Sequence, residues 1–315
     1  MVFAAATQDV WRWQPHPEVW LLVAGLLVAY VYSAKVIGPK MVRNGEPPVS
    51  KAQWRWFAGA MLMLWVASDW PIHDIGEKSL YSGHMLQHMM LSYFMPPMAL
   101  FATPTWLARL LIGKGRGYAA MKWLTKPVVA GVVFNGLVMV THIPGVVNYS
   151  VGEGATNGLV HYLLHTMVVL TSMLAWMCIC GPIPEFRISY GGQMIFLFSM
   201  SIIPTVPAGW LTFADGVVYK SYNHGGQIWG LSPTYDQQIA GAIMKIGGSI
   251  FLWIVVVVLF FKRFAAGWES SNSYKKVVRS SAPLVGLEEK PLTWDEVEQH
   301  FAKVPPAPEP DSSER

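Results

Sequence analysis

Residues 236–261, DQQIAGAIMKIGGSIFLWIVVVVLFF, decide the fold class. Most of this stretch is apolar, and about 20 apolar residues are enough for a helix to cross the hydrocarbon core of a bilayer. Six further segments are similar, although the second and fourth of the seven are short. The predicted spans are 19–38, 54–70, 79–101, 127–143, 157–180, 192–213 and 236–261. The sequence therefore predicts an all-α integral membrane protein that folds as a seven-transmembrane helix bundle.

The composition of the whole chain agrees with a membrane protein. Of its 315 residues, 53% are hydrophobic and only 13% are charged, and the mean hydropathy is +0.34. A soluble domain carries about twice that share of charged residues. The net charge of +4 comes from basic residues in short loops, which set membrane topology, so we expect no nucleic-acid partner. The chain also lacks the phosphate-loop, dinucleotide-binding and H-E-x-x-H zinc motifs.

The lysines and arginines favour one side of the predicted spans. If the N-terminus lies outside, the outer stretches hold only Arg12, Lys78 and Lys220, whereas the inner stretches hold most of the other basic residues. Cytoplasmic loops are enriched in Lys and Arg. The pattern therefore predicts an N-terminus outside and a C-terminus in the cytoplasm.

This topology divides the chain into three parts. Residues 1–18 form an outer N-terminal segment, 19–262 the membrane domain and 263–315 a cytoplasmic tail. The tail is polar and ends in PPAPEPDSSER, a composition typical of disorder. Within the tail, we expect one short amphipathic helix near 292–303.

Two pairs of histidines have the spacing of one helical turn. His84 and His88 lie near the start of the third predicted span, and His161 and His165 lie near the start of the fifth. Residues four apart share one face of a helix, and imidazole inside a membrane is rare and costly without a partner. His142, at the end of the fourth span, is expected at the same depth. We therefore predict a metal site near the outer face, made by all five histidines.

The identity of the metal is less well determined. Neutral imidazole suits copper, zinc, iron and nickel. Met85 and Met89 directly follow the first histidine pair, and thioether sulfur favours Cu(I). However, both lie about 100° around the helix from the histidines, and most methionines of such a chain serve packing. They favour copper only slightly.

Other polar residues have simpler interpretations. His16, His73 and His224 fall in outer loops, where water can satisfy them. Cys178 and Cys180 are two apart, so their side chains diverge on a helix, and packing is the expected role.

Lys245 lies inside the last predicted span and requires a partner there. Asp236 and Asp215 are the candidates by depth.

Four stretches of the chain resemble one known family. They are SGHMLQHMMLSYFMPPMALFATPTW, HYLLHT, GPIPEFRISYGGQ and LSPTYDQQIAGAIMKIGG, all within residues 80–250. They are similar to the multi-spanning CtaG family of bacterial cytochrome c oxidase assembly proteins. This resemblance implies a multi-pass protein of the bacterial plasma membrane that helps to mature a haem–copper oxidase. It implies copper as the cofactor at the five histidines, with oxidase subunits or copper donors as partners.

Three functions stay open at this point. The first is a non-catalytic assembly factor that handles copper. The second is a membrane zinc hydrolase, with three histidines and a water on zinc and with Asp69 or Asp74 as the general base. The third is a b-type haem protein, with one axial histidine from the third span and one from the fifth.

Overall fold

The computed structural model describes residues 11–43, 45–152, 154–223, 228–280 and 293–302. Every regular element within these ranges is helical, which confirms the all-α prediction. The chain divides into two units, Met1–Arg263 and Phe264–Arg315. In the second unit, α15 (Trp294–Ala302) confirms the helix expected near 292–303. The predicted disordered end of the tail, and His224, lie outside the described residues.

Each of the seven predicted spans is helical. Their helices are α1 (Pro17–Tyr32), α2 (Lys51–Ser68), α4 (Tyr81–Met89) continued by η3 (Met90–Phe94) and α5 (Met95–Ala102), α8 (Pro127–Thr141), α10 (Ala155–Cys180), α11 (Tyr190–Ile202) with α12 (Thr205–Thr212), and α13 (Pro233–Ala242) continued by η7 (Ile243–Gly247) and α14 (Gly248–Ser280). Shorter helices connect them: α3 (Ile72–Lys78), α6 (Thr105–Ile112), α7 (Arg116–Leu124) and α9 (Pro144–Ser150).

By length and composition, the chain is a multi-pass membrane protein. Fewer than seven of its helical stretches are long and apolar enough to count as membrane spans. Four helical stretches qualify, and the pair α7 and α8, bent by 70°, makes a fifth if it counts as one span. The four are Pro17–Lys40, Thr156–Cys180, Tyr190–Thr212 and Pro233–Trp268. The α4–α5 stretch does not qualify because α4 is rich in polar side chains, and these face the protein interior. Seven spans and the orientation of the chain stay predictions.

The orientation is directly testable with reporter fusions. A reporter joined after Arg263 should be cytoplasmic, and one inserted in the 214–235 loop should be exported, because the basic residues fall mainly on one side. Alkaline phosphatase and green fluorescent protein fusions at both places measure this. The reverse pattern at both places would overturn the predicted orientation.

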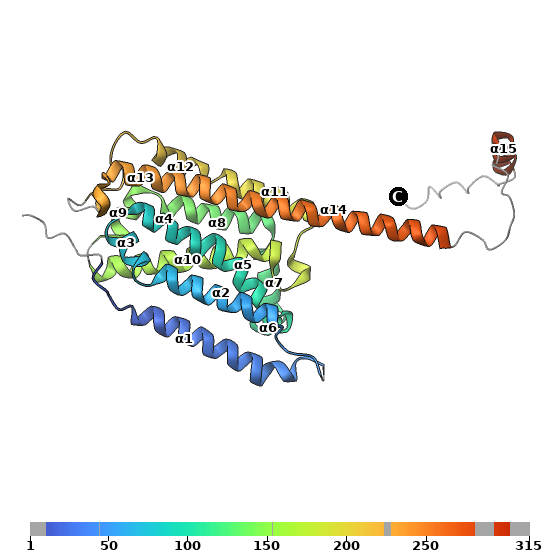
Figure 1. Ribbon diagram of the computed structural model, residues 1–315, viewed down its shortest axis with the longest axis horizontal. Coiled ribbons are helices and arrows are strands. Elements are labelled where there is room, and N and C mark those ends of the chain that lie inside the picture. The colour runs from blue at the N-terminus through green and yellow to red at the C-terminus, as the bar shows by residue number, and fades with distance from the viewer. Residues whose placement is uncertain (1–10, 44, 153, 224–227, 281–292, 303–315) are drawn as a thin grey trace, which may run out of the picture. The chain divides into compact units, whose positions relative to one another are not determined.

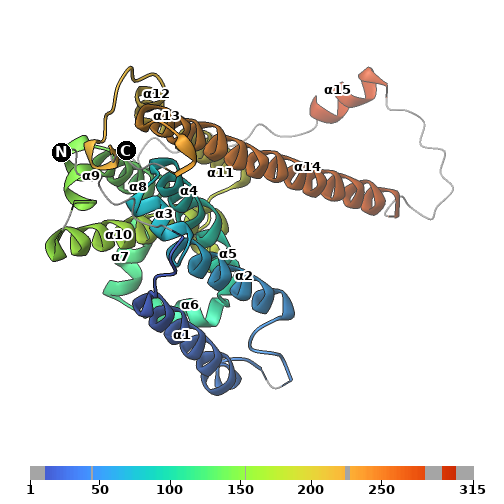
Figure 2. The ribbon, with the colours of Figure 1, turned by 60° about the vertical axis from the view of Figure 1, so that its left-hand side comes forward.

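Helix α4 lies at the centre of the first unit. It packs against α3 and α13, while its continuation α5 packs against α2 and α10 (Figures 1 and 2). Two glycines permit the close packing of these helices. A Cβ atom on Gly76 of α3 would lie 2.9 Å from the backbone nitrogen of His84, and one on Gly241 of α13 would lie 2.7 Å from the carbonyl oxygen of Ala208 on α12. Because glycine has no Cβ, α3 can lie close to the turn of α4 that carries His84, and α13 can lie close to α12.

A missing backbone hydrogen bond within the α4–α5 stretch allows this stretch to bond to α10. Pro96 has no N–H to donate to the carbonyl of Ser92, four residues earlier, and a π-helical turn precedes it. The freed Ser92 oxygen accepts hydrogen bonds from the Ser172 hydroxyl and, at 3.2 Å, from Nε1 of Trp176, both on α10. Because membrane helices must satisfy every buried backbone group, this proline fixes the two histidine-bearing helices against each other.

Candidate metal centre

Four of the five predicted histidines lie in contact. We call His84 and His88 of α4, together with His161 and His165 of α10, the histidine cluster. Within each helix the ring centroids are 4.6 Å and 4.4 Å apart. Between the helices, the His165 ring lies 5.1 Å from that of His84 and 4.5 Å from that of His88. The two H-x-x-x-H pairs therefore face each other at one depth.

Three members of the cluster offer ring nitrogens to a common point. One ligand nitrogen each from His84, His161 and His165 lies within 4.8 Å of the other two. Around a metal bound at about 2.0 Å in tetrahedral geometry, the nitrogens are about 3.3 Å apart. Small side-chain rotations are therefore enough to close the site. The fourth histidine is held nearby, since Nε2 of His88 lies 2.9 Å from Nε2 of His84.

Unpaired nitrogen atoms make the cluster a candidate ligand site. His84 and His161 are buried and His165 is half-buried. His84 Nδ1, His161 Nε2 and His165 Nε2 have no hydrogen-bond partner among the described residues. Buried polar atoms are nearly always paired, because an unpaired one costs about 1–3 kcal/mol. A bound metal ion would satisfy these nitrogen atoms.

His142, the fifth predicted ligand, lies beside the cluster and outside the group of three. It follows the last residue of α8, and its ring centroid is 6.4 Å from that of His88. Its Nδ1 lies 2.6 Å from the carbonyl oxygen of Val138, so this nitrogen carries the proton. Its buried Nε2 then holds a lone pair and has no partner among the described residues. His142 can serve as a ligand only after a larger movement than the others require.

A buried carboxylate positions the first histidine pair. Asp236 of α13 accepts hydrogen bonds from the backbone nitrogens of Tyr81 and Ser82, at 2.6 and 3.1 Å, and from the Ser82 hydroxyl. These nitrogens belong to the first turn of α4, whose N–H groups have no acceptor within the helix and where a negative charge is favourable. Asp236 therefore fixes the start of α4, one turn before His84.

This role of Asp236 corrects a prediction. Lys245 does not pair with Asp236 or Asp215. Its ammonium group donates to the Thr205 hydroxyl at 2.6 Å and to the Ser201 carbonyl at 3.3 Å. Ser201 lies in the last turn of α11, which ends at Ile202, so its carbonyl oxygen has no helical donor and can accept from Lys245.

Loss of the Asp236 carboxylate should destabilise the protein. Asp236→Ala leaves two backbone donors of α4 unpaired, and we expect a loss of about 2 kcal/mol or more in unfolding free energy. Thermal unfolding of the purified protein in detergent measures it. Asp215→Ala is the matched control because Asp215 is exposed, and it should leave the melting temperature unchanged. Equal melting temperatures for both variants would show that Asp236 does not fix α4.

His73 lies next to the cluster and His16 lies next to His73. Both have side-chain partners, so the prediction that water satisfies them was wrong for both. The His73 ring centroid is 6.4 Å from that of His161 and 5.0 Å from that of His16. His73 accepts a hydrogen bond from Gln87 of α4 at 3.1 Å. The i, i+4 pairs on α3, His73 with Glu77 and Asp74 with Lys78, were the sequence signal that could have revealed these side chains as partnered.

Acidic side chains surround these outer histidines. His73 donates to Glu77 at 3.2 Å, and this hydrogen bond lowers the pKa of Glu77 to about 2, although burial opposes the shift. His16 lies 2.9 Å from the fully buried Asp74 and 3.0 Å from Glu18. Burial lowers the pKa of His16, but the bonds to both carboxylates outweigh it and the net pKa is raised. Three carboxylates therefore lie beside these outer histidines, and one of them, Asp74, also pairs with Lys78.

A cavity of about 450 Å³ reaches the cluster from between the helices. His73, Gln87, His161 and His165 lie along it, and Glu18 lies at its margin. The other walls are mostly apolar side chains of α1, α2, α5 and α10. Two members of the cluster therefore border a space between the helices that is large enough for a small ion.

A family model described as cytochrome c oxidase caa3 assembly factor (Caa3_CtaG) matches residues 28–266, most of the chain. The chain belongs to this family. Searches of curated proteins and of solved structures gave no match. The matched region contains the entire histidine cluster and His142, and it ends before α15.

The carboxylates considered as general bases have other partners in this assembly factor. Asp69 accepts hydrogen bonds from the indole nitrogens of Trp20 and Trp65, at 2.8 and 2.6 Å. Asp74 is paired with His16 and Lys78. No hydrogen bond between described residues joins either carboxylate to the cluster or to His142.

The two methionines beside the first histidine pair and the two cysteines of α10 belong to the packed core of the protein. Met85 packs with Tyr81 and Met244 in one apolar group, and Met89 contacts the Gly248 region of α14. Cys178 and Cys180 are buried in a second apolar group with Phe196. Among the described residues, the sulfur atoms of these four side chains therefore have a packing role.

Proposed function

We propose that this cytochrome c oxidase assembly factor binds copper at the histidine cluster and helps to deliver it to a haem–copper oxidase. The observation that carries the proposal is the grouping of His84, His161 and His165. One ring nitrogen of each lies within 4.8 Å of the others, and each ring has a buried nitrogen without a partner among the described residues. In the predicted orientation the cluster lies near the outer face of a bacterial plasma membrane. The partners would be an oxidase subunit as acceptor and a copper donor.

Copper fits both the ligand set and the family. Imidazole binds copper more tightly than the other divalent first-row metals in a given site, and an oxidase of the haem–copper type requires copper for maturation. His84, His161 and His165 would hold the ion, and His88 would complete the shell. The acidic side chains around His16 and His73 would raise the local concentration of cations.

The geometry supports the two alternatives, a zinc hydrolase and a haem protein, less well. A zinc hydrolase requires a general base beside the metal, and both candidate carboxylates have other partners. A haem between α4 and α10 would have to part rings whose centroids are only 4.5–5.1 Å apart. A non-catalytic role is therefore the simpler interpretation.

The direct test is the metal content of the purified protein together with its optical spectrum. Copper at close to one equivalent and no Soret band support the proposal. Zinc retained in preference to copper would favour the hydrolase, and a Soret band would favour the haem protein.

A further inference from the structure

A second cavity does not involve the histidines. It has a volume of about 750 Å³ and lies between α2, α5, α10, α11 and α14. Its side chains come from the last turns of α5 and α10 and the first turn of α11, whereas the cluster occupies the first turns of α4 and α10. It is a separate site.

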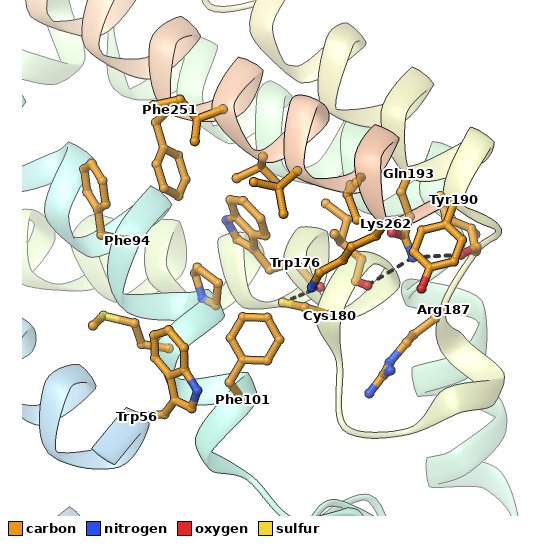
Figure 3. Close-up of a pocket in the computed structure, with 18 of the residues that line it drawn as sticks. Trp56, Phe94, Phe101, Trp176, Cys180, Arg187, Tyr190, Gln193, Phe251 and Lys262 are labelled. Atoms are coloured by element: carbon orange, nitrogen blue, oxygen red, sulfur yellow. Dashed lines mark hydrogen bonds between the residues drawn. The ribbon is translucent and has the colours of Figure 1, made fainter. Parts of the chain in front are cut away.

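The walls of this cavity are amphipathic (Figure 3). Phe94, Trp176 and Phe251 line it, together with aliphatic residues of α14 such as Val255. Lys262, Arg187, Tyr190 and Gln193 gather at the opposite side. A ligand that fits must therefore combine an apolar chain with a polar head, and the volume falls in the range of sites for molecules of drug size.

The polar end carries uncompensated positive charge. No Asp or Glu lines the cavity. Lys262 forms no ion pair with any described residue, and Arg187 only donates from Nε to the Gly181 carbonyl oxygen, at 2.5 Å. Arg109, by contrast, is neutralised by an ion pair with Glu185. An anionic group bound here would form ion pairs with Lys262 and Arg187.

A buried amide gives the second polar contact. Gln193 is 6% exposed, and its nitrogen donates to the carbonyl oxygens of Ile179 and Ile188, at 3.2 and 2.9 Å. Both bonds fix the side chain, so its oxygen is an acceptor, and this oxygen has no partner among the described residues. It requires a donor such as a hydroxyl group.

We propose that this cavity binds an anionic glycerophospholipid with a hydroxyl-bearing head group. The phosphate would lie between Lys262 and Arg187, a head-group hydroxyl would donate to Gln193, and an acyl chain would lie along Phe94, Trp176 and Phe251. Basic pockets between membrane helices recognise acidic head groups in this way. The site is independent of the copper proposal.

Native mass spectrometry of the full chain tests the proposal, with phosphatidylglycerol and phosphatidylcholine as probes. The wild-type protein should retain phosphatidylglycerol on the order of tenfold more tightly than phosphatidylcholine, since two cations face the phosphate. Arg187→Gln with Lys262→Gln should remove this preference. Lys114→Gln with Arg116→Gln is the matched control, because it removes two exposed charges that do not line the cavity.

Val255→Phe tests the apolar part of the site. It narrows the cavity and should weaken retention of phosphatidylglycerol while both cations remain. Monodispersity and circular dichroism confirm that each variant is folded. Equal retention of both lipids by the wild type, or an unchanged preference in the Arg187 and Lys262 double variant, overturns the proposal. Unchanged retention of phosphatidylglycerol by Val255→Phe would show that no acyl chain lies in this cavity and would also overturn the proposal.

Discussion

Replacement of His84 and His165 together by alanine should abolish copper binding. The two residues come from different helices and supply two of the three ring nitrogens that lie within 4.8 Å of one another. A single remaining nitrogen of that group cannot hold the ion, and we expect a loss of roughly 100-fold or more in affinity, because even residues that only support ligands contribute 10–100-fold. Equilibrium dialysis against Cu(I) and Cu(II), followed by metal analysis, measures the bound copper.

Two further variants make this experiment specific. His142→Ala should reduce affinity less than the double variant, since its ring lies 6.4 Å from His88 and outside the group of three. His300→Ala is the control because it removes an imidazole from α15, outside the matched region. Full copper binding by a folded His84→Ala, His165→Ala protein would end the shared-site hypothesis.

Deletion of the gene should leave the oxidase polypeptides present but most of the oxidase activity absent. An acceptor that never receives copper lacks its catalytic metal centre, although its chain is still made. Complementation with His88→Ala should fail, whereas a protein that lacks residues 285–315 should restore activity, because the tail carries no ligand pattern. Oxidase activity and subunit levels in isolated membranes provide the measurement.

External copper distinguishes delivery from other kinds of assistance. Excess copper should partly restore activity in the deletion strain through mass action at the unfilled oxidase site. Neither a zinc hydrolase nor a haem protein predicts such a rescue. Normal oxidase activity in the deletion strain at low copper would contradict a role in assembly. Low activity that copper never improves would contradict copper delivery and point to stabilisation of a subunit.

The sequence by itself determined the fold class and the positions of the helices. Hydrophobic length is a local property, so each predicted span became a helix, and the helix in the tail was found as expected. The count of seven spans is harder to establish from hydropathy alone. Helix α4 shows why: Tyr81, Ser82 and Gln87 lower its apolar character, yet all three face the interior and not the lipid.

The sequence also determined the two histidine pairs, because four-residue spacing fixes which side chains share a helix face. Only the tertiary structure decided that the two faces meet. Pro96 frees a carbonyl that Ser172 and Trp176 of α10 satisfy, and Asp236 fixes the start of α4 from a helix more than 150 residues later. Contacts between helices likewise place His142 beside His88 and His73 beside His161. Contacts between helices depend on which distant donor meets which freed acceptor, and no periodicity within a single segment encodes that pairing.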